Sequence, residues 1–126
     1  MKSLIASSLI LATLLGAWIC FDIYSNNTLH DMTDKIDIIV TSVEAENWKE
    51  SYAKVNALNK DWHRYKKVAS FFLNTQHIND ADYGFAKSVK YVKAQDVSNG
   101  SGELANLKEQ LKFLHDNESL TLANIL

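Results

Sequence analysis

Apolar positions along the chain form one long uncharged run followed by four stripes with helical spacing. The run extends from Leu4 to Phe21 without a charged residue. As a helix, these eighteen residues would be about 27 Å long, close to the thickness of a hydrocarbon core. The pattern predicts an all-α fold in which an N-terminal transmembrane helix is followed by an antiparallel bundle of about four helices.

The four stripes repeat apolar residues at steps of three and four, which places them on one face of a helix. They run from Leu29 to Val43, from Trp48 to Phe72, from Phe85 to Val92 and from Leu104 to Leu114. Short connections between amphipathic helices favour antiparallel neighbours. We therefore expect an up-and-down bundle.

Capping residues predict where the second and third helices begin. Asn47 is followed three residues later by Glu50, a capping-box pattern that starts the second helix close to the end of the first. Asn79 with Asp82 could cap the third helix, and a start nearer Thr75 is the alternative.

Small and polar residues predict two further boundaries. Residues 25–27, with the sequence SNN, are where we expect any break between the anchor and the first bundle helix, although that helix could simply continue the anchor. Residues 98–103, with the sequence SNGSGE, predict a loop. Ser101 is the expected cap of the fourth helix.

The apolar run is interpreted as an uncleaved anchor. A secretory signal peptide is the rival interpretation, but its apolar region usually spans about 7–15 residues and ends in a small-x-small cleavage site. Trp18, Ile19 and Phe21 occupy that end of the run. Trp18 and Ile19 also stand where a lipoprotein signal would need small residues before Cys20.

Charges that flank the run predict its orientation. Lys2 precedes the run, whereas Asp22 and Asp31 follow it, which favours a cytoplasmic N-terminus. We therefore expect a single-pass protein of the cell membrane with the bulk of the chain outside the cytoplasm. The expected parts are an anchor with a short cytoplasmic stub over residues 1–25, an extracytoplasmic helical bundle over 26–119 and an apolar C-terminal tail over 120–126.

Composition narrows the classes of partner. The chain is 47% apolar and 22% charged, and its formal net charge is −2. These values are typical of a folded domain and do not predict a basic face for nucleic acid, so no nucleic-acid partner is expected. One cysteine, Cys20, cannot form an intramolecular disulfide.

The sequence contains few candidate residues for catalysis or metal binding. Four histidines are present, at positions 30, 63, 77 and 115, but no HExxH or ExxH pair appears. No serine or cysteine lies in a recognisable nucleophile motif, and the GSG of residues 100–102 lacks the lysine and strand of a phosphate-binding loop. We expect no enzyme, no cofactor and no metal site. A wall- or lipid-associated enzyme or metal carrier stays open if histidines and acids converge in the fold.

Aromatic residues of the second helix are candidate interaction residues. Trp48 and Trp62 are two heptads apart, with Tyr52 between them. Packing between helices is the simpler explanation of this spacing. The alternative is an exported, tetratricopeptide-like module that holds a peptide or small ligand on the Trp48/Trp62 face.

The C-terminal sequence LTLANIL, residues 120–126, is a second candidate interaction segment. Four of its side chains are aliphatic, and the amide of Asn124 would be costly to bury without a hydrogen-bond partner. The tail either lies back along its own bundle or is captured by another protein. The candidate residues are Leu122, Asn124, Ile125 and Leu126.

Several of these features together resemble the bacterial domain of unknown function 4363 family. They are the N-terminal membrane helix, the sequence NWKESYAKVNALNKDW, His77 followed by acids, Tyr91 on an amphipathic helix, the leucine-rich last helix and the closing LTLANIL. The resemblance implies a small membrane-anchored helical protein of Gram-positive bacteria and implies no activity. Gly84, inside the third helix, departs from the pattern.

The sequence thus predicts an accessory or protein-interaction subunit of a membrane complex. Its expected partners are the lipid bilayer, through Leu4 to Phe21, and another membrane protein.

Overall fold

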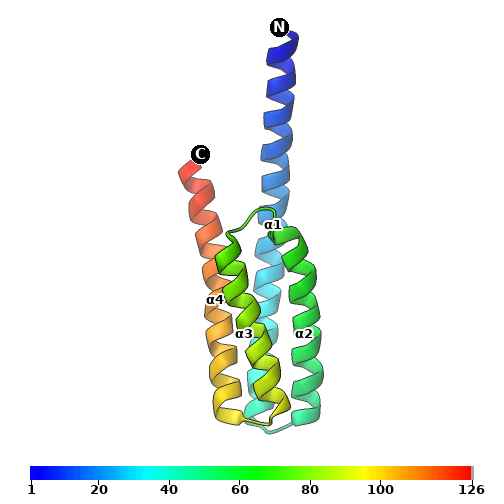
Figure 1. Ribbon diagram of the computed structural model, residues 1–126, viewed down its shortest axis with the longest axis vertical. Coiled ribbons are helices and arrows are strands. Elements are labelled where there is room, and N and C mark those ends of the chain that lie inside the picture. Colours follow the sequence, from blue (N-terminus) through cyan, green and yellow to red (C-terminus); the bar gives the residue numbers. More distant parts are fainter. Residues whose placement is uncertain (126) are drawn as a thin grey trace.

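The structure is a computed structural model that describes residues 1–125, with the backbone alone for 117–125. The described chain forms four helices and no strand: α1 (Lys2–Glu44), α2 (Trp48–Ala69), α3 (Thr75–Lys93) and α4 (Val97–Ile125). The prediction of an all-α fold with a long apolar N-terminal helix and a helical bundle is confirmed. Neighbouring helices run antiparallel, and α1 packs on α2 and α4, while α3 packs on the same two helices (Figure 1).

Helix α1 has two halves with different surroundings. Its first half projects alone from the bundle, whereas its second half is one of the four bundle helices (Figure 1). The helix is continuous, so the alternative in which the first bundle helix continues the anchor is confirmed, and no break occurs at residues 25–27. Ser25 is fully buried, and its hydroxyl shares a 2.6 Å hydrogen bond with the Tyr65 hydroxyl on α2. Ser25 therefore joins two helices instead of ending one.

The two turns at the end of the bundle remote from the N-terminus have the same backbone conformation. After α1, Glu46 has a positive φ of 57° and Asn47 donates its backbone N–H to the Ser42 carbonyl. After α3, Gln95 has the same φ and Asp96 donates to the Tyr91 carbonyl. Both are Schellman-type helix ends, in which a left-handed residue allows the last carbonyls to be hydrogen-bonded.

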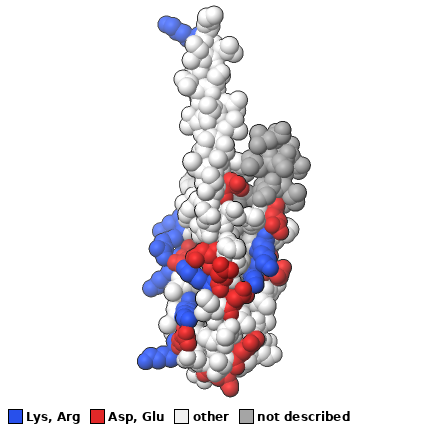
Figure 2. Space-filling model, turned by 180° about the vertical axis from the view of Figure 1, so that it is seen from behind, with Lys and Arg blue, Asp and Glu red and all other residues white. Residues whose placement is uncertain are grey.

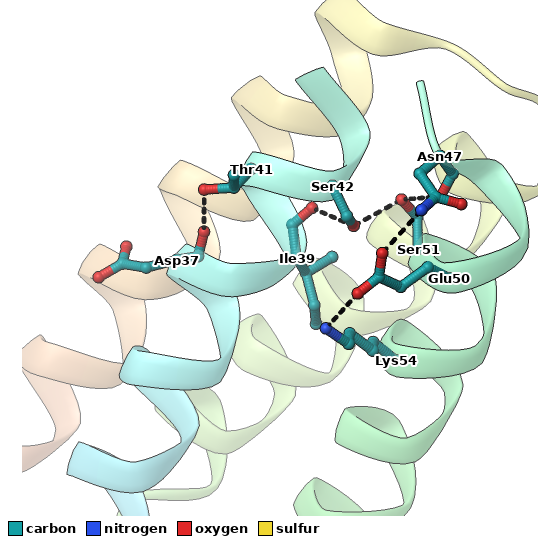
Figure 3. Close-up of polar contacts among 8 residues, drawn as sticks. All are labelled: Asp37, Ile39, Thr41, Ser42, Asn47, Glu50, Ser51 and Lys54. Atoms are coloured by element: carbon teal, nitrogen blue, oxygen red, sulfur yellow. Dashed lines mark hydrogen bonds and ion pairs between the residues drawn. The ribbon is translucent and has the colours of Figure 1, made fainter. Parts of the chain in front are cut away.

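The start of α2 agrees with the prediction, although the expected cap bond is not made. Asn47 is the N-cap residue, but its side chain accepts no helix N–H; its amide donates to Glu50 Oε2 at 2.8 Å. Figure 3 shows this contact beside the hydrogen bond that Ser42 and Ser51 share across α1 and α2, with 2.7 Å between the hydroxyl oxygens. The hairpin is thus closed by one exposed contact, between Asn47 and Glu50, and one buried contact, between Ser42 and Ser51.

The predicted loop over residues 98–103 and the cap at Ser101 are both wrong. Helix α4 already begins at Val97, and Asp96 caps it by accepting the Asn99 backbone N–H at 3.0 Å. The Ser101 hydroxyl donates to the Ser98 carbonyl within the helix. Two glycines in one short stretch suggested a loop, but they lie in the first turns of α4.

The start of α3 corresponds to the alternative prediction. The helix begins at Thr75, with Asn74 as N-cap accepting from the Gln76 backbone N–H at 2.8 Å. Asn79 and Asp82, the other candidates, lie inside the helix.

The core lies between all four helices and follows the predicted stripes, except that Tyr52 of the second stripe is exposed. It consists mainly of aliphatic side chains, with Trp62, Tyr65 and Phe85 as its largest members. Gly84 of α3 lies where α4 comes close, because an added Cβ would be 2.7 Å from Gln110 Oε1 and 3.0 Å from Leu107 Cδ1. Gly84 therefore serves the close packing of α3 on α4.

Candidate interaction sites

An aromatic cluster lies where the exposed half of α1 enters the bundle. Phe21 is buried and stacks on Phe72, with ring centroids 4.3 Å apart and an interplanar angle of 8°. Trp18 packs edge-on against Phe72 at 5.7 Å. Tyr24 and Tyr65 pack beside these rings. We call these five residues the junction cluster.

The junction cluster includes one residue of the connection between α2 and α3, residues 70–74. Within this connection Phe72 is partly buried against the core, whereas its neighbour Phe71 is 86% exposed. Phe71 and Phe72 donate their backbone N–H groups to Val68 and Ala69, so the chain turns tightly here. Of two successive aromatic residues, one is held in the cluster and the other faces outward.

The exposed half of α1 is a continuous apolar surface. Its most apolar window of 18 residues has a mean hydropathy of 2.2, and 6% of that window is buried. By length and composition this is the one described helix able to cross a membrane, a property that anchors and signal sequences share. Figure 2 shows mixed charges over the bundle, whereas the projecting half of α1 is uncoloured except for a basic side chain near its tip. In the sequence, Lys2 is the only residue before Asp22 with a charged side chain.

Trp62 is placed in the core and not on an exposed face. It is fully buried, and its ring stacks on Phe85 with centroids 5.0 Å apart. Its indole N–H donates to Asp82 Oδ1 at 2.6 Å, and the other oxygen of Asp82 pairs with Lys66. Trp62 is therefore a packing residue that links α2 to α3.

Trp48 and Tyr52 lie at the far end of the bundle from the junction cluster. Together with Lys49, Val92 and Lys93 they line a shallow hollow. Trp48 is half-buried against the core, and Tyr52 is exposed. The three aromatic candidates of α2 are thus not brought together on one surface.

A third surface is the groove between α1 and α2. Lys35 of α1 lies 2.9 Å from Asp61 Oδ2 of α2 and 3.0 Å from Asp31 Oδ2 of its own helix. The hydrogen bond to Asp61, and then that to Asp31, raises the pKa of Lys35. Beside this ion pair the groove is lined by the buried apolar residues Ile39 and Leu58 and the exposed residues Ile38 and Ala57.

The candidate tail residues lie outside what the structure describes in side-chain detail. The backbone of α4 is helical through Ile125, but the side chains of Leu122, Asn124 and Ile125 are not described, and neither is any part of Leu126. Whether the tail docks on its own bundle or on a partner stays a prediction.

His30 of α1 and His115 of α4 line one hollow together with Asp116. His30 lies 3.6 Å from Asp34, and His77 packs edge-on against Phe113 at 5.0 Å. Among the described residues, no three His, Cys, Asp or Glu side chains are grouped so that they could hold a metal ion.

The comparison with known families agrees with the resemblance seen in the sequence. A family model described as "Domain of unknown function (DUF4363)" matches residues 20–125. The chain belongs to this family. The DUF4363 region begins at the junction cluster and covers the whole bundle, while most of the apolar run precedes it. Searches of the curated proteins and of the solved structures found no match.

Sequence reasoning missed the junction cluster. A signal was present, because FFLN at residues 71–74 follows directly on the last turn of α2. Two adjacent phenylalanines at a chain reversal are unusual, since connections between helices are normally polar. Their contact with Trp18 and Phe21 depends on how α1 and α2 are aligned along their lengths.

Proposed function

We propose that this protein is a single-pass, membrane-anchored helical bundle that stands outside the cytoplasm and serves as a non-enzymatic interaction subunit of a membrane complex. The observation that carries the proposal is the continuity of α1. One helix supplies both an exposed apolar rod and one wall of the bundle core. The bundle is therefore rigidly attached to the exposed apolar half of α1, and its orientation is fixed relative to the environment in which that half is embedded.

A lipid bilayer is the environment that suits this exposed half of α1. Its large aliphatic side chains are mostly more than half exposed, including Leu4, Leu9 and Leu14. Water would disfavour so large a contiguous apolar surface, whereas a hydrocarbon core would not. The helix satisfies its own backbone hydrogen bonds, as a bilayer requires. Lys2 before the run and Asp22 after it support an N-terminus in the cytoplasm.

A second membrane helix is the partner that we propose for the anchor. Ser8, Ala12, Gly16 and Cys20 recur at steps of four along α1, and all four are exposed. A Cβ added at Gly16 would meet nothing within 4 Å. Small residues at this spacing allow the backbones of two membrane helices to approach closely.

The non-enzymatic part of the proposal rests on how the buried polar groups are used. Ser25 pairs with Tyr65, Ser42 pairs with Ser51, and Trp62 donates to Asp82. Each contact joins two helices, which is a structural role. The tetratricopeptide-like alternative is not favoured, because it needs Trp62 on an exposed face and that residue is fully buried.

Crosslinking followed by co-purification from native membranes tests the proposal. The unmodified chain should be recovered with specific companions, and Gly16→Leu should lose them while remaining in the membrane. Leu14→Phe is the matched control, because it also enlarges an exposed side chain but lies on the opposite side of the helix. Recovery of monomer alone from the unmodified chain would contradict the interaction role. A shortened chain in the soluble fraction would contradict the anchor.

A further inference from the structure

We propose that the end of the bundle next to the anchor is itself a lipid-binding surface, with Phe71 inserted into the interface of the bilayer that α1 crosses. This inference rests on the proposed membrane anchor and goes beyond it. It gives the protein a second attachment to lipid, through the connection between α2 and α3.

The height of this connection along α1 is set by aromatic packing. Phe72 stacks on Phe21 at 4.3 Å and meets the edge of Trp18 at 5.7 Å. Phe21 is the last residue of the uncharged run. A bilayer that covers the run therefore has its outer boundary at the level of the connection. Trp and Tyr are enriched at that boundary in membrane proteins, and the junction cluster contains Trp18 and Tyr24.

Phe71 is the residue placed to enter the interface. It adjoins the fixed Phe72, so it is held at the same height, and it is 86% exposed. Val68, three residues earlier on α2, is also exposed. The two side chains provide an apolar contact at the end of the bundle nearest to the exposed half of α1.

Basic residues next to this contact suit the lipid headgroups. Lys66 and Lys67 lie in the last turn of α2. Lys66 pairs with Asp82, whereas Lys67 is exposed and has no ion pair among the described residues. A long lysine side chain at this height can extend its ammonium group to the phosphates while its methylene stem contacts apolar surface.

The position of α4 also supports a lipid-binding surface at this end of the bundle. The backbone of α4 extends past the connection between α2 and α3, at the end of the bundle from which α1 projects (Figure 1). Asp116 lines the same hollow as Asn26. Helices α1 and α4 run antiparallel (Figure 1) and rise equally per residue, so equal numbers of residues counted from this hollow toward the N-terminus of α1 and toward the C-terminus of α4 reach the same level. Nine residues from Asp116 lead to Ile125, and nine residues back from Asn26 lead to Ala17. No charged residue occurs from Ser119 to Leu126. This uncharged stretch thus ends at about the level of the anchor.

Lipid is the occupant that these observations favour, since the anchor fixes a bilayer at this height on every side of α1. A protein partner that covers Phe71 is the competing occupant and is an outcome of the test.

Spin-label accessibility in reconstituted liposomes tests the inference on the full chain. In a Cys20→Ser background, labels are attached singly to Phe71→Cys, Leu11→Cys and Tyr83→Cys, and the protein is placed in phosphatidylcholine–phosphatidylglycerol vesicles. Collisions with oxygen report lipid, and collisions with a water-soluble nickel chelate report water. Tyr83 is the matched control, because it is an aromatic residue of the bundle that is 66% exposed and lies two turns farther from the anchor. We expect a ratio of oxygen to nickel accessibility several-fold higher at position 71 than at position 83.

The label at position 11 separates failure of this inference from failure of the anchor. If position 11 reports lipid and position 71 reports water, the inference is overturned and the anchor stands. If position 11 also reports water, the anchor itself fails. If position 71 is shielded from both reagents, a second copy of the chain covers it, since the vesicles contain no other protein, and this likewise overturns the inference.

Discussion

Trp62 and Tyr52 lie on the same helix, yet their side chains have different surroundings. Trp62 is fully buried and hydrogen-bonded to Asp82, whereas Tyr52 is exposed. We expect Trp62→Ala to lower the free energy of unfolding by about 3–5 kcal/mol, because it leaves a large cavity. Tyr52→Ala should change it by no more than about 0.5 kcal/mol. Urea unfolding in detergent micelles, followed by far-ultraviolet circular dichroism, measures both.

Equal losses for the two variants would contradict the placement of Trp62 in the core. Trp62→Phe adds a finer comparison, because it keeps an aromatic ring against Phe85 and removes the donor to Asp82. Its loss should lie between those of the two alanine variants.

Asp96 at the start of α4 should make stability depend on pH. The backbone N–H of Asn99, and then its side-chain amide, donate to the carboxylate and lower the pKa of Asp96 from its ordinary value of 3.8. A lowered pKa in the folded state means that the stabilisation is present above pH 3.8 and is lost as the pH falls through the folded value. Asp96→Ala should therefore differ from the native chain at neutral pH and approach it in acid.

Thermal unfolding of the two chains between pH 2 and pH 7 provides this measurement. Ser101→Ala is the control, since serine does not titrate in this range, and its difference from the native chain should stay constant. A difference for Asp96→Ala that does not shrink in acid would show that the carboxylate does not cap α4.

Helix boundaries illustrate which parts of the fold the sequence could predict. The apolar stripes correctly gave four helices, because burial of one face imposes a period that is visible in the residues. The turn before α4 was missed because it uses Gln95 with a φ of 57°, a position where glycine is usual. The actual signal was Asp96 followed three residues later by Asn99. Gly100 and Gly102 instead suggested a loop at this position.

Replacement by alanine should change the free energy of unfolding in opposite directions at two glycines that lie inside helices. A Cβ at Gly102 of α4 would meet nothing within 4 Å, so Gly102→Ala should raise the free energy of unfolding by about 0.5–1 kcal/mol. At Gly84 of α3 the Cβ would come within 3.0 Å of Leu107, which is fully buried. Overpacking costs about 1–3 kcal/mol, which exceeds the same propensity gain, so Gly84→Ala should be destabilising.

Urea unfolding of both variants gives the comparison, and the native chain is the common reference. A stabilised Gly84→Ala variant would mean that α3 and α4 can separate without loss, contrary to the close packing described above.

For the molecule as a whole, the site at the junction depends on matched helix lengths. Helix α2 has 22 residues, close to the length of α1 between Phe21 and Glu44, so the connection after α2 returns to the level of Phe21. Amphipathic periods predict the helices and their antiparallel order but do not fix this alignment. The junction cluster could be found only after the helix ends were known.

Continuity of α1 across the junction is the property on which both attachments to lipid depend, and it can be measured as a distance. Leu11 and Ile38 are 27 residues apart on α1, and both side chains are exposed. A straight helix places them about 40 Å apart. Spin labels at these positions, in a Cys20→Ser background in liposomes, should give one narrow distance distribution near this value.

Asn26→Pro tests whether the continuity of the helix itself causes that distance. Proline removes the N–H that bonds to the carbonyl four residues earlier and its ring clashes with that carbonyl, at a cost of about 3 kcal/mol. The distribution should become shorter and broader, while Asn26→Ala should leave it unchanged, because alanine favours the helix. A broad distribution in the unmodified chain would mean that the bundle swings freely from its anchor. In that case Phe71 would not be held at the bilayer surface, since Phe21 could no longer position Phe72 relative to the run.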